Sequence, residues 1–180
     1  SEMCIRDSLI TYNNHLLQIT QDAKAQGNSK LGIRGDLRKV AHNLELFIKD
    51  SSLSDYYMIS LLTFRRREKD LLLRKDSKYL AKLSKDIAKL KERVESRNLD
   101  EDRKANLYGH IESYKKLFSS LVSNIEAIKG SHIKLNNEVH EINIISESLI
   151  KKSYSEMNVF KSEVVGDVKK EFYIFSIVAS

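Results

Sequence analysis

The chain has 180 residues, a formal net charge of +6 at pH 7, 41% hydrophobic residues and 31% charged residues. This balance is typical of a soluble chain with a buried core, and the single cysteine excludes an internal disulfide. The 31 basic residues are mixed with 25 acidic ones throughout, without a basic arm, so nucleic acid is not an expected partner. With no proline and only six glycines to interrupt helices, we expect an all-α fold.

The first helix is predicted after a short leader. Residues 1–8, SEMCIRDS, are similar to translated adapter sequence, and we expect them to be non-native. Apolar residues then recur every three or four positions, which predicts a helix over 9–25. This stripe comprises Leu9, Tyr12, Leu16 and Ile19. The segment GNSKLGIRG (27–35) holds three of the six glycines and is typical of a turn.

A second helix is predicted from Asp36, which can cap it or join its first turn. Its apolar stripe runs through Leu37, Val40 or Ala41, Leu44, and Phe47 or Ile48. The cluster DSSLSD (50–55) ends this helix and offers Ser54 as a cap for the next one. We expect the next helix to run without a break from about residue 56 to 97, and residues 98–100 to end it.

The most regular pattern follows residue 100, where apolar residues alternate at spacings of four and three, as in the packed seam of a coiled coil. These residues are Leu107, Ile111, Tyr114, Phe118, Leu121, Ile125 and Ile128. Gly130 and Ser131 are expected to break this helix, and a last helix is predicted toward Val168. Helices joined by short turns imply antiparallel neighbours. The predicted architecture is an antiparallel helical bundle of the four-helix type, with two stacked modules sharing long helices as a variant.

The C-terminal stretch FYIFSIVAS (172–180) carries no charge and follows Lys169, Lys170 and Glu171. It is too short to span a bilayer, which needs about 20 apolar residues. A pair of lysines before an apolar run is typical of a helix entering lipid, whereas the alternative is the buried end of a helix. We favour the first interpretation, with a helical domain over 9–170 and the start of a truncated transmembrane helix at 171–180.

The segment FRRREKDLLLRKD (64–76) places many charges within a helical pattern. Extending the apolar stripe backward from Leu80 brings it through Lys69 and Arg66, so both would face the bundle if the helix is continuous. A kink near residues 75–78 would turn them away from it.

Charged groups on a buried stripe cost several kcal/mol unless they are paired. Internal pairs offer one solution: Arg65 with Glu68, Arg66 with Asp70, and Lys69 with Glu45. The alternative is that an acidic ligand neutralises the excess positive charge, because guanidinium groups bind carboxylates through two parallel hydrogen bonds. From the residues alone, the structural interpretation ranks first.

Two segments together resemble a known family: GIRGDLRKVAHNLE (32–45) and LLTFRRREKDLLLRKDSKYL (61–80). They resemble the helical bimodular sensor domain of bacterial methyl-accepting chemotaxis receptors, which is also found on some sensor kinases. The matching positions of the charged motif are Arg65, Arg66, Glu68, Lys69, Asp70, Arg74 and Tyr79. The chain departs from the family pattern at Ile33, Ala41 and Leu71, where the family has leucine, valine and phenylalanine. The resemblance covers most of 27–129 well and 130–170 loosely.

The resemblance implies an extracytoplasmic sensor domain in the periplasm or extracellular space, attached to the inner (plasma) membrane through its C-terminal helix. Such a domain binds a small organic acid between helices and passes a helix displacement to a cytoplasmic signalling region, here of a chemotaxis transducer. A homodimer is implied, and enzymatic activity is not expected. The alternatives are the input domain of a sensor histidine kinase and a purely structural helical-bundle or coiled-coil segment.

The expected contacts to a small carboxylate ligand are Arg65, Arg66 and Arg74, with Lys69 and Tyr79 in support. Glu68 and Asp70 are expected to orient the arginines. We expect no metal site, because the five histidines form no HExxH motif or i, i+4 pair. No cofactor and no catalytic residue is expected, because glycine-rich phosphate loops and GxSxG elbows are absent from the sequence.

Overall fold

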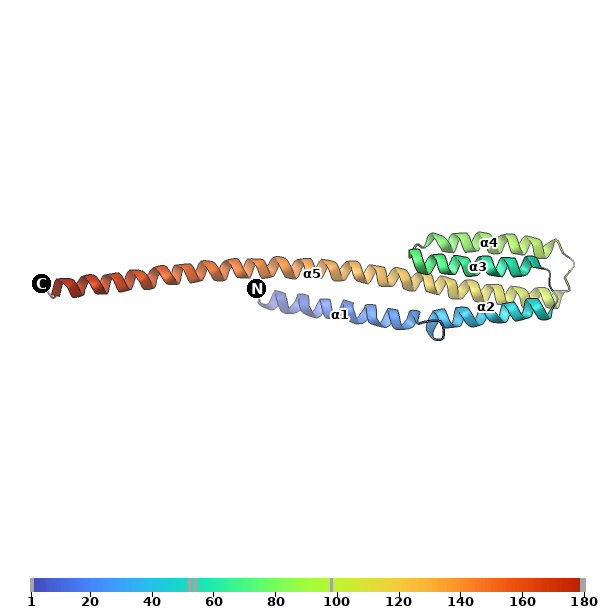
Figure 1. The fold of residues 1–180 in the computed structure, drawn as a ribbon, viewed down its shortest axis with the longest axis horizontal. Helices are drawn as coiled ribbons and strands as arrows, with labels where there is room; N and C mark the ends of the chain where they lie inside the picture. Colours follow the sequence, from blue (N-terminus) through green and yellow to red (C-terminus); the bar gives the residue numbers. More distant parts are fainter. Residues whose placement is uncertain (1, 52, 54, 98, 179–180) are drawn as a thin grey trace. The chain divides into compact units, whose positions relative to one another are not determined.

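The computed structural model describes residues 2–51, 53, 55–97 and 99–178, with side chains described from residue 5 to residue 170. The regular structure of these residues is entirely α-helical, which confirms the predicted all-α class. The helices, shown in Figure 1, are α1 (Glu2–Gln26), α2 (Gly32–Asp50), α3 (Asp55–Arg74), α4 (Lys78–Glu95) and α5 (Glu101–Val178). Ser54, the predicted cap of the third helix, lies outside the described residues.

The chain divides into two compact units. The first, which we call the core unit, comprises Leu16–Ile133 and contains the end of α1, all of α2, α3 and α4, and the first part of α5. The second combines α1 up to His15 with the part of α5 that begins at Lys134. All of the buried side chains described below, and the candidate site, belong to the core unit.

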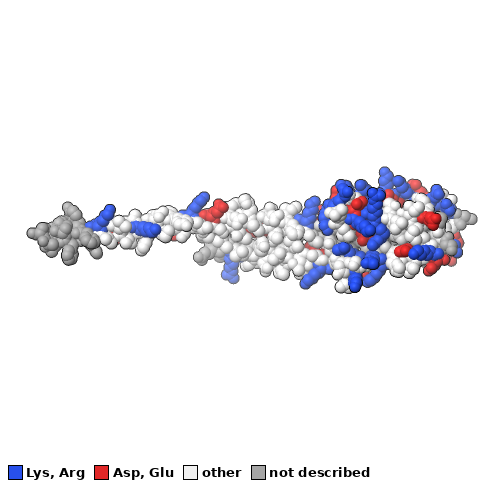
Figure 2. All heavy atoms as spheres, in the orientation of Figure 1, with Lys and Arg blue, Asp and Glu red and all other residues white. Residues whose placement is uncertain are grey.

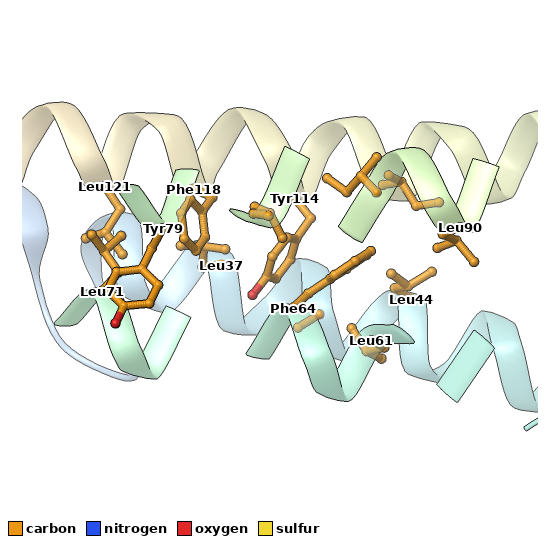
Figure 3. Packing of buried hydrophobic residues seen from close by; sticks show 14 of the residues in the cluster. Leu37, Leu44, Leu61, Phe64, Leu71, Tyr79, Leu90, Tyr114, Phe118 and Leu121 are labelled. Atoms are coloured by element: carbon orange, nitrogen blue, oxygen red, sulfur yellow. The ribbon is translucent and has the colours of Figure 1, made fainter. Parts of the chain in front are cut away.

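One hydrophobic core joins four helical segments of the core unit. Figure 3 shows side chains from α2, α3, α4 and α5 pointing toward one another: Leu37, Leu44, Leu61, Phe64, Leu71, Tyr79, Leu90, Tyr114, Phe118 and Leu121. Three aromatic rings are neighbours in this core, since the ring centroid of Tyr114 lies 5.9 Å from that of Phe64 and 6.5 Å from that of Phe118. Large buried aromatic side chains contribute most of the packing energy of such a core.

The heptad seam predicted after residue 100 is confirmed, because its first six residues are buried in the core. Asp100 caps α5, since its Oδ1 accepts a hydrogen bond from the backbone N–H of Arg103 at 2.9 Å. The predicted break at Gly130 and Ser131 is wrong, because α5 continues through both residues to Val178. A single glycine costs a helix only about 1 kcal/mol, which its neighbours can offset.

The prediction of one helix over 56–97 is also wrong, because α3 ends at Arg74 and α4 begins at Lys78. Lys75 adopts a positive φ of 53°, a left-handed conformation that ends a helix. Asp76 then accepts a hydrogen bond from the backbone N–H of Lys78 at 2.9 Å and starts α4. The segment is therefore a helical hairpin, and the break resets which face of each helix is buried.

The second unit has few buried apolar side chains among its described residues. Leu9, Ile10, Ile144, Ile150 and Phe160 are each at least half exposed. Among the residues that the structure describes, no helix carries an apolar stretch long enough to cross a membrane. The proposed membrane entry at 171–180 has a helical backbone as far as Val178, and its last two residues lie outside the described part of the chain.

Candidate anion-binding site

A groove of about 810 Å³ lies between α2 and α3 in the core unit, within the size range of about 300–1,000 Å³ that is usual for ligand sites. Its floor is apolar and is formed by Gly35, Ala41, Met58, Leu61 and Leu62. Its remaining lining is polar and mostly cationic: Ser29, Lys30, Arg38, Lys39, His42, Glu45, Arg65 and Lys69. We call this feature the basic groove. Figure 2 shows Lys and Arg side chains gathered over one part of the core unit, where α3 ends and α4 begins.

Glu45 is the acidic residue among those that line the basic groove, and it is already bound to a cation. Its Oε1 accepts a hydrogen bond from the Nζ of Lys49 at 2.7 Å, and this contact lowers the pKa of the Glu45 carboxyl. Glu45 is therefore ionised at neutral pH and forms an ion pair with Lys49. The groove lining carries five Lys and Arg side chains and this one acid, so the groove keeps a positive potential.

The cations of the groove fall into two sets. Lys39 pairs with Asp36 at 3.1 Å, and Arg65 pairs with Glu68. In contrast, Lys30, Arg38 and Lys69 have no carboxylate within 4.0 Å among the residues that the structure describes. These three side chains are exposed, so each retains hydrogen-bond donors for an anion.

The turn before α2 holds Lys30 at the end of the groove. The Oδ1 of Asn28 accepts hydrogen bonds from the backbone N–H groups of Lys30 and Leu31, at 2.8 and 3.1 Å. Gly35 lets this turn lie directly against α2, because a Cβ at position 35 would come within 2.5 Å of the carbonyl carbon of Lys30. The glycine-rich segment thus brings a turn lysine onto the same groove as the first turns of α2.

Behind the groove wall, Arg65 joins a buried network that reaches α5. Its Nη1 donates a hydrogen bond to Oε2 of Glu68, and the hydroxyl of Tyr114 donates to the same oxygen at 2.9 Å. Glu68 is only 6% exposed and is the buried charged residue among the described residues. Burial and the charge of Glu68 raise the pKa of Tyr114 well above its usual range. A buried carboxylate is tolerated here because it has both a cation and a hydroxyl donor.

Three tyrosines with raised pKa values, Tyr57, Tyr108 and Tyr114, predict a delayed alkaline titration. Burial, and then the hydrogen bond to Glu95, raise the pKa of Tyr108 to about 12, and burial raises those of Tyr57 and Tyr114. Because the raised pKa belongs to the folded state, the stability linked to Tyr108 is complete below pH 10 and is lost as the pH rises toward about 12.

We expect phenolate absorbance of the folded chain to rise in two stages, with the late stage smaller in Tyr108→Phe. In urea, all eight tyrosines should titrate together near their ordinary pKa. A single transition in the folded chain, identical to that in urea, would contradict the burial of these hydroxyls.

Two of the five predicted ligand residues, Arg65 and Lys69, line the basic groove. Arg66 and Arg74 are exposed outside it, and Tyr79 is only 3% exposed within the hydrophobic core. The expectation that Arg66 and Lys69 face the bundle depended on a continuous helix; the break at 75–77 turns both away, and both are exposed. The stripe was extended from α4 across the break at 75–77, whereas the buried stripe of α3 runs through Tyr57, Leu61, Phe64, Glu68 and Leu71.

The predicted pair of Arg65 with Glu68 is confirmed. The pairs of Arg66 with Asp70 and of Lys69 with Glu45 are not formed among the described residues. Sequence reasoning missed Lys30, Arg38, Lys39 and His42 as groove residues. The sequence pattern could have identified two of them, because Arg38 and His42 stand next to the buried positions of α2 within the segment that resembles the sensor family.

Comparison of the chain with protein-family models, with curated proteins and with solved structures gave no match. The interpretation of the groove therefore depends on its own chemistry. An apolar floor beside three cations that have no carboxylate partner in the described part of the chain favours an organic anion, which can cover the floor and neutralise the cations at the same time.

Proposed function

We propose that the chain is the extracytoplasmic ligand-binding domain of a transmembrane chemoreceptor, and that it binds a small organic acid in the basic groove. The observation that carries the proposal is the placement of Lys30, Arg38 and Lys69 around an apolar floor without partner carboxylates among the described residues. The resemblance of 32–45 and 61–80 to a sensor family supports it independently, because 32–45 lies on α2 and most of 61–80 lies on α3, the two helices that form the groove.

The core unit would be an antiparallel four-helix module in the periplasm or extracellular space, linked to the inner membrane through the C-terminal helix. The receptor would act as a homodimer in chemotaxis signalling. A sensor histidine kinase with the same input domain would use the groove in the same way, since the two differ only in their cytoplasmic output.

The Arg65 network supports a mechanism for signalling. A ligand shifts an equilibrium only if it binds one arrangement better than the other. A carboxylate bound at Lys69 lies one helical turn from Arg65, so it competes with Glu68 for that guanidinium. Glu68 would then keep the hydroxyl of Tyr114 on α5 as its partner in the described network. Because a buried carboxylate without its cation is costly, this change favours a shift of α5 against α3. Displacements of about 1–2 Å are typical of such helix switches.

A second candidate function is purely structural, and one observation favours it. Arg65 is already paired with Glu68, so part of the charged motif is satisfied within the protein. In this view the basic groove is a solvated surface, and the cations contribute solubility and little else.

Calorimetric titration of the 180-residue chain with unbranched C2 to C6 carboxylates separates the two candidates. We expect at least one acid to bind, and Lys69→Gln or Arg38→Gln to weaken that binding about tenfold, because a charged hydrogen bond contributes about 1.5–3 kcal/mol. The affinity should also fall at high salt.

Arg66→Gln is the matched control, because Arg66 lies on the same helix but outside the groove. It should leave the affinity unchanged. The absence of heat with every acid, or equal losses for Arg66→Gln and Lys69→Gln, would favour the structural candidate.

A further inference from the structure

We propose that the ligand of the basic groove is an amphiphilic monocarboxylate, bound with its carboxylate among Lys30, Arg38 and Lys69 and its apolar chain along the floor toward Met58. This inference rests on the proposed function, because it concerns the same groove. It narrows the ligand from small organic acids in general to acids with one charged end and one extended apolar end.

The two ends of the groove differ in charge. α2 and α3 are consecutive helices with a short connection, so the start of α2 lies opposite the end of α3. Lys30, Arg38 and Lys69 therefore gather at the end of the groove that is far from this connection. Met58 and Glu45 lie at the end that is near it. From Lys69 to Met58 the groove follows about 16 Å of helix, at about 1.5 Å per residue, which exceeds the length of a C2 to C4 acid.

The floor offers apolar surface that the protein itself leaves uncovered. Leu61 is buried in the core, but the neighbouring Leu62, which also belongs to the floor, is 61% exposed. Met58 is partly buried against the core on the same side. Covering such side chains with an alkyl chain is favourable in proportion to the apolar area removed from water. A longer chain should therefore bind more tightly than a shorter one.

Glu45 disfavours a second carboxylate at the apolar end. Its Oε1 is bound to Lys49 at 2.7 Å, and its Oε2 lies 3.9 Å from the Nδ1 of His42. The charge of Lys49 is thus already engaged, and a dicarboxylate long enough to reach this end would bring its second charge next to that of Glu45. The groove therefore selects for one carboxylate rather than two.

The test is calorimetric titration of the 180-residue chain with butyrate, octanoate and suberate, the last being the dicarboxylate of the same length as octanoate. We expect octanoate to bind at least tenfold more tightly than both butyrate and suberate. Leu62→Ser should weaken octanoate binding at least threefold and leave butyrate binding unchanged. Leu73→Ser is the matched control, because Leu73 is exposed on the same helix outside the groove, and it should change neither.

The outcomes distinguish the two proposals. Octanoate binding that Lys69→Gln weakens and Leu73→Ser does not would support the inference. Equal affinities for octanoate, butyrate and suberate would overturn the inference and leave the proposed function standing, provided that Lys69→Gln weakens all three. Binding of octanoate that Lys69→Gln does not change would also overturn it, because the carboxylate would then lie elsewhere. The absence of binding by all three acids, and by the C2 to C6 series, would overturn both.

Discussion

Arg65→Met is expected to lower the free energy of unfolding of the core unit by about 3 kcal/mol, because it leaves Glu68 buried without a cation. Glu68 has only 6% of its surface exposed, and the hydroxyl of Tyr114 would be its remaining partner in the described network. A buried carboxylate in this position can neither be well hydrated nor move readily to the surface. Urea unfolding monitored by circular dichroism measures the loss.

The double variant Arg65→Met with Glu68→Gln should recover at least half of that loss. Glutamine removes the buried charge but keeps an oxygen that can accept the hydrogen bond from Tyr114. Lys39→Met is the control, because Lys39 and Asp36 form a pair of the same i, i+3 spacing at 3.1 Å on the exposed surface of the groove. It should cost less than about 0.5 kcal/mol. Equal losses for Arg65→Met and Lys39→Met would mean that the Arg65 pair is effectively solvated.

Gly35→Ala and Gly109→Ala should change stability in opposite directions, although both glycines lie in helices. A Cβ at position 35 would lie 2.5 Å from the carbonyl carbon of Lys30, and the contact is with backbone, which cannot rotate away. We expect a loss of about 1–3 kcal/mol. A Cβ at position 109 would meet nothing within 4 Å, so the higher helix propensity of alanine should stabilise α5 by about 1 kcal/mol.

The same pair of variants also tests the groove. Gly35→Ala must displace the turn that holds Lys30, so it should weaken the binding of a carboxylate, whereas Gly109→Ala should not. Urea unfolding and calorimetry of both variants measure the two effects. A stable Gly35→Ala variant with unchanged binding would show that the turn does not depend on close contact with α2.

Which residues are helical could largely be predicted from the sequence, because helix formation depends on local periodicity, whereas the ends of several helices could not. The seam from Leu107 to Ile125 repeats at spacings of four and three, and each of its members is buried. The same is true of Leu37, Leu44 and Ile48 in α2. Errors arose where one residue decides the outcome. Lys75 ends α3 in a left-handed conformation, although neither glycine nor proline stands at this position to predict it. In contrast, α5 continues through Gly130.

The candidate site was only partly accessible from the sequence. The charged motif pointed to α3, and Arg65 and Lys69 do line the basic groove. Arg66 was placed on the wrong face because the stripe of one helix was extended into the next. The contribution of α2 and of the preceding turn depends on which helix packs beside α3, and periodicity within one helix carries no information about its neighbour.

The sequence by itself determined the helical class, the heptad seam of α5 and the charge of the motif, since all three follow from residue type and spacing along one chain segment. Only the tertiary structure decided that Glu68 is buried with Arg65 and Tyr114, and that Lys30, Arg38 and Lys69 share one groove. Apart from the pair of Arg65 and Glu68, which lies within α3, these relations join residues on different helices, or on a helix and a turn. They depend on how the helices pack, which periodicity along one segment does not specify.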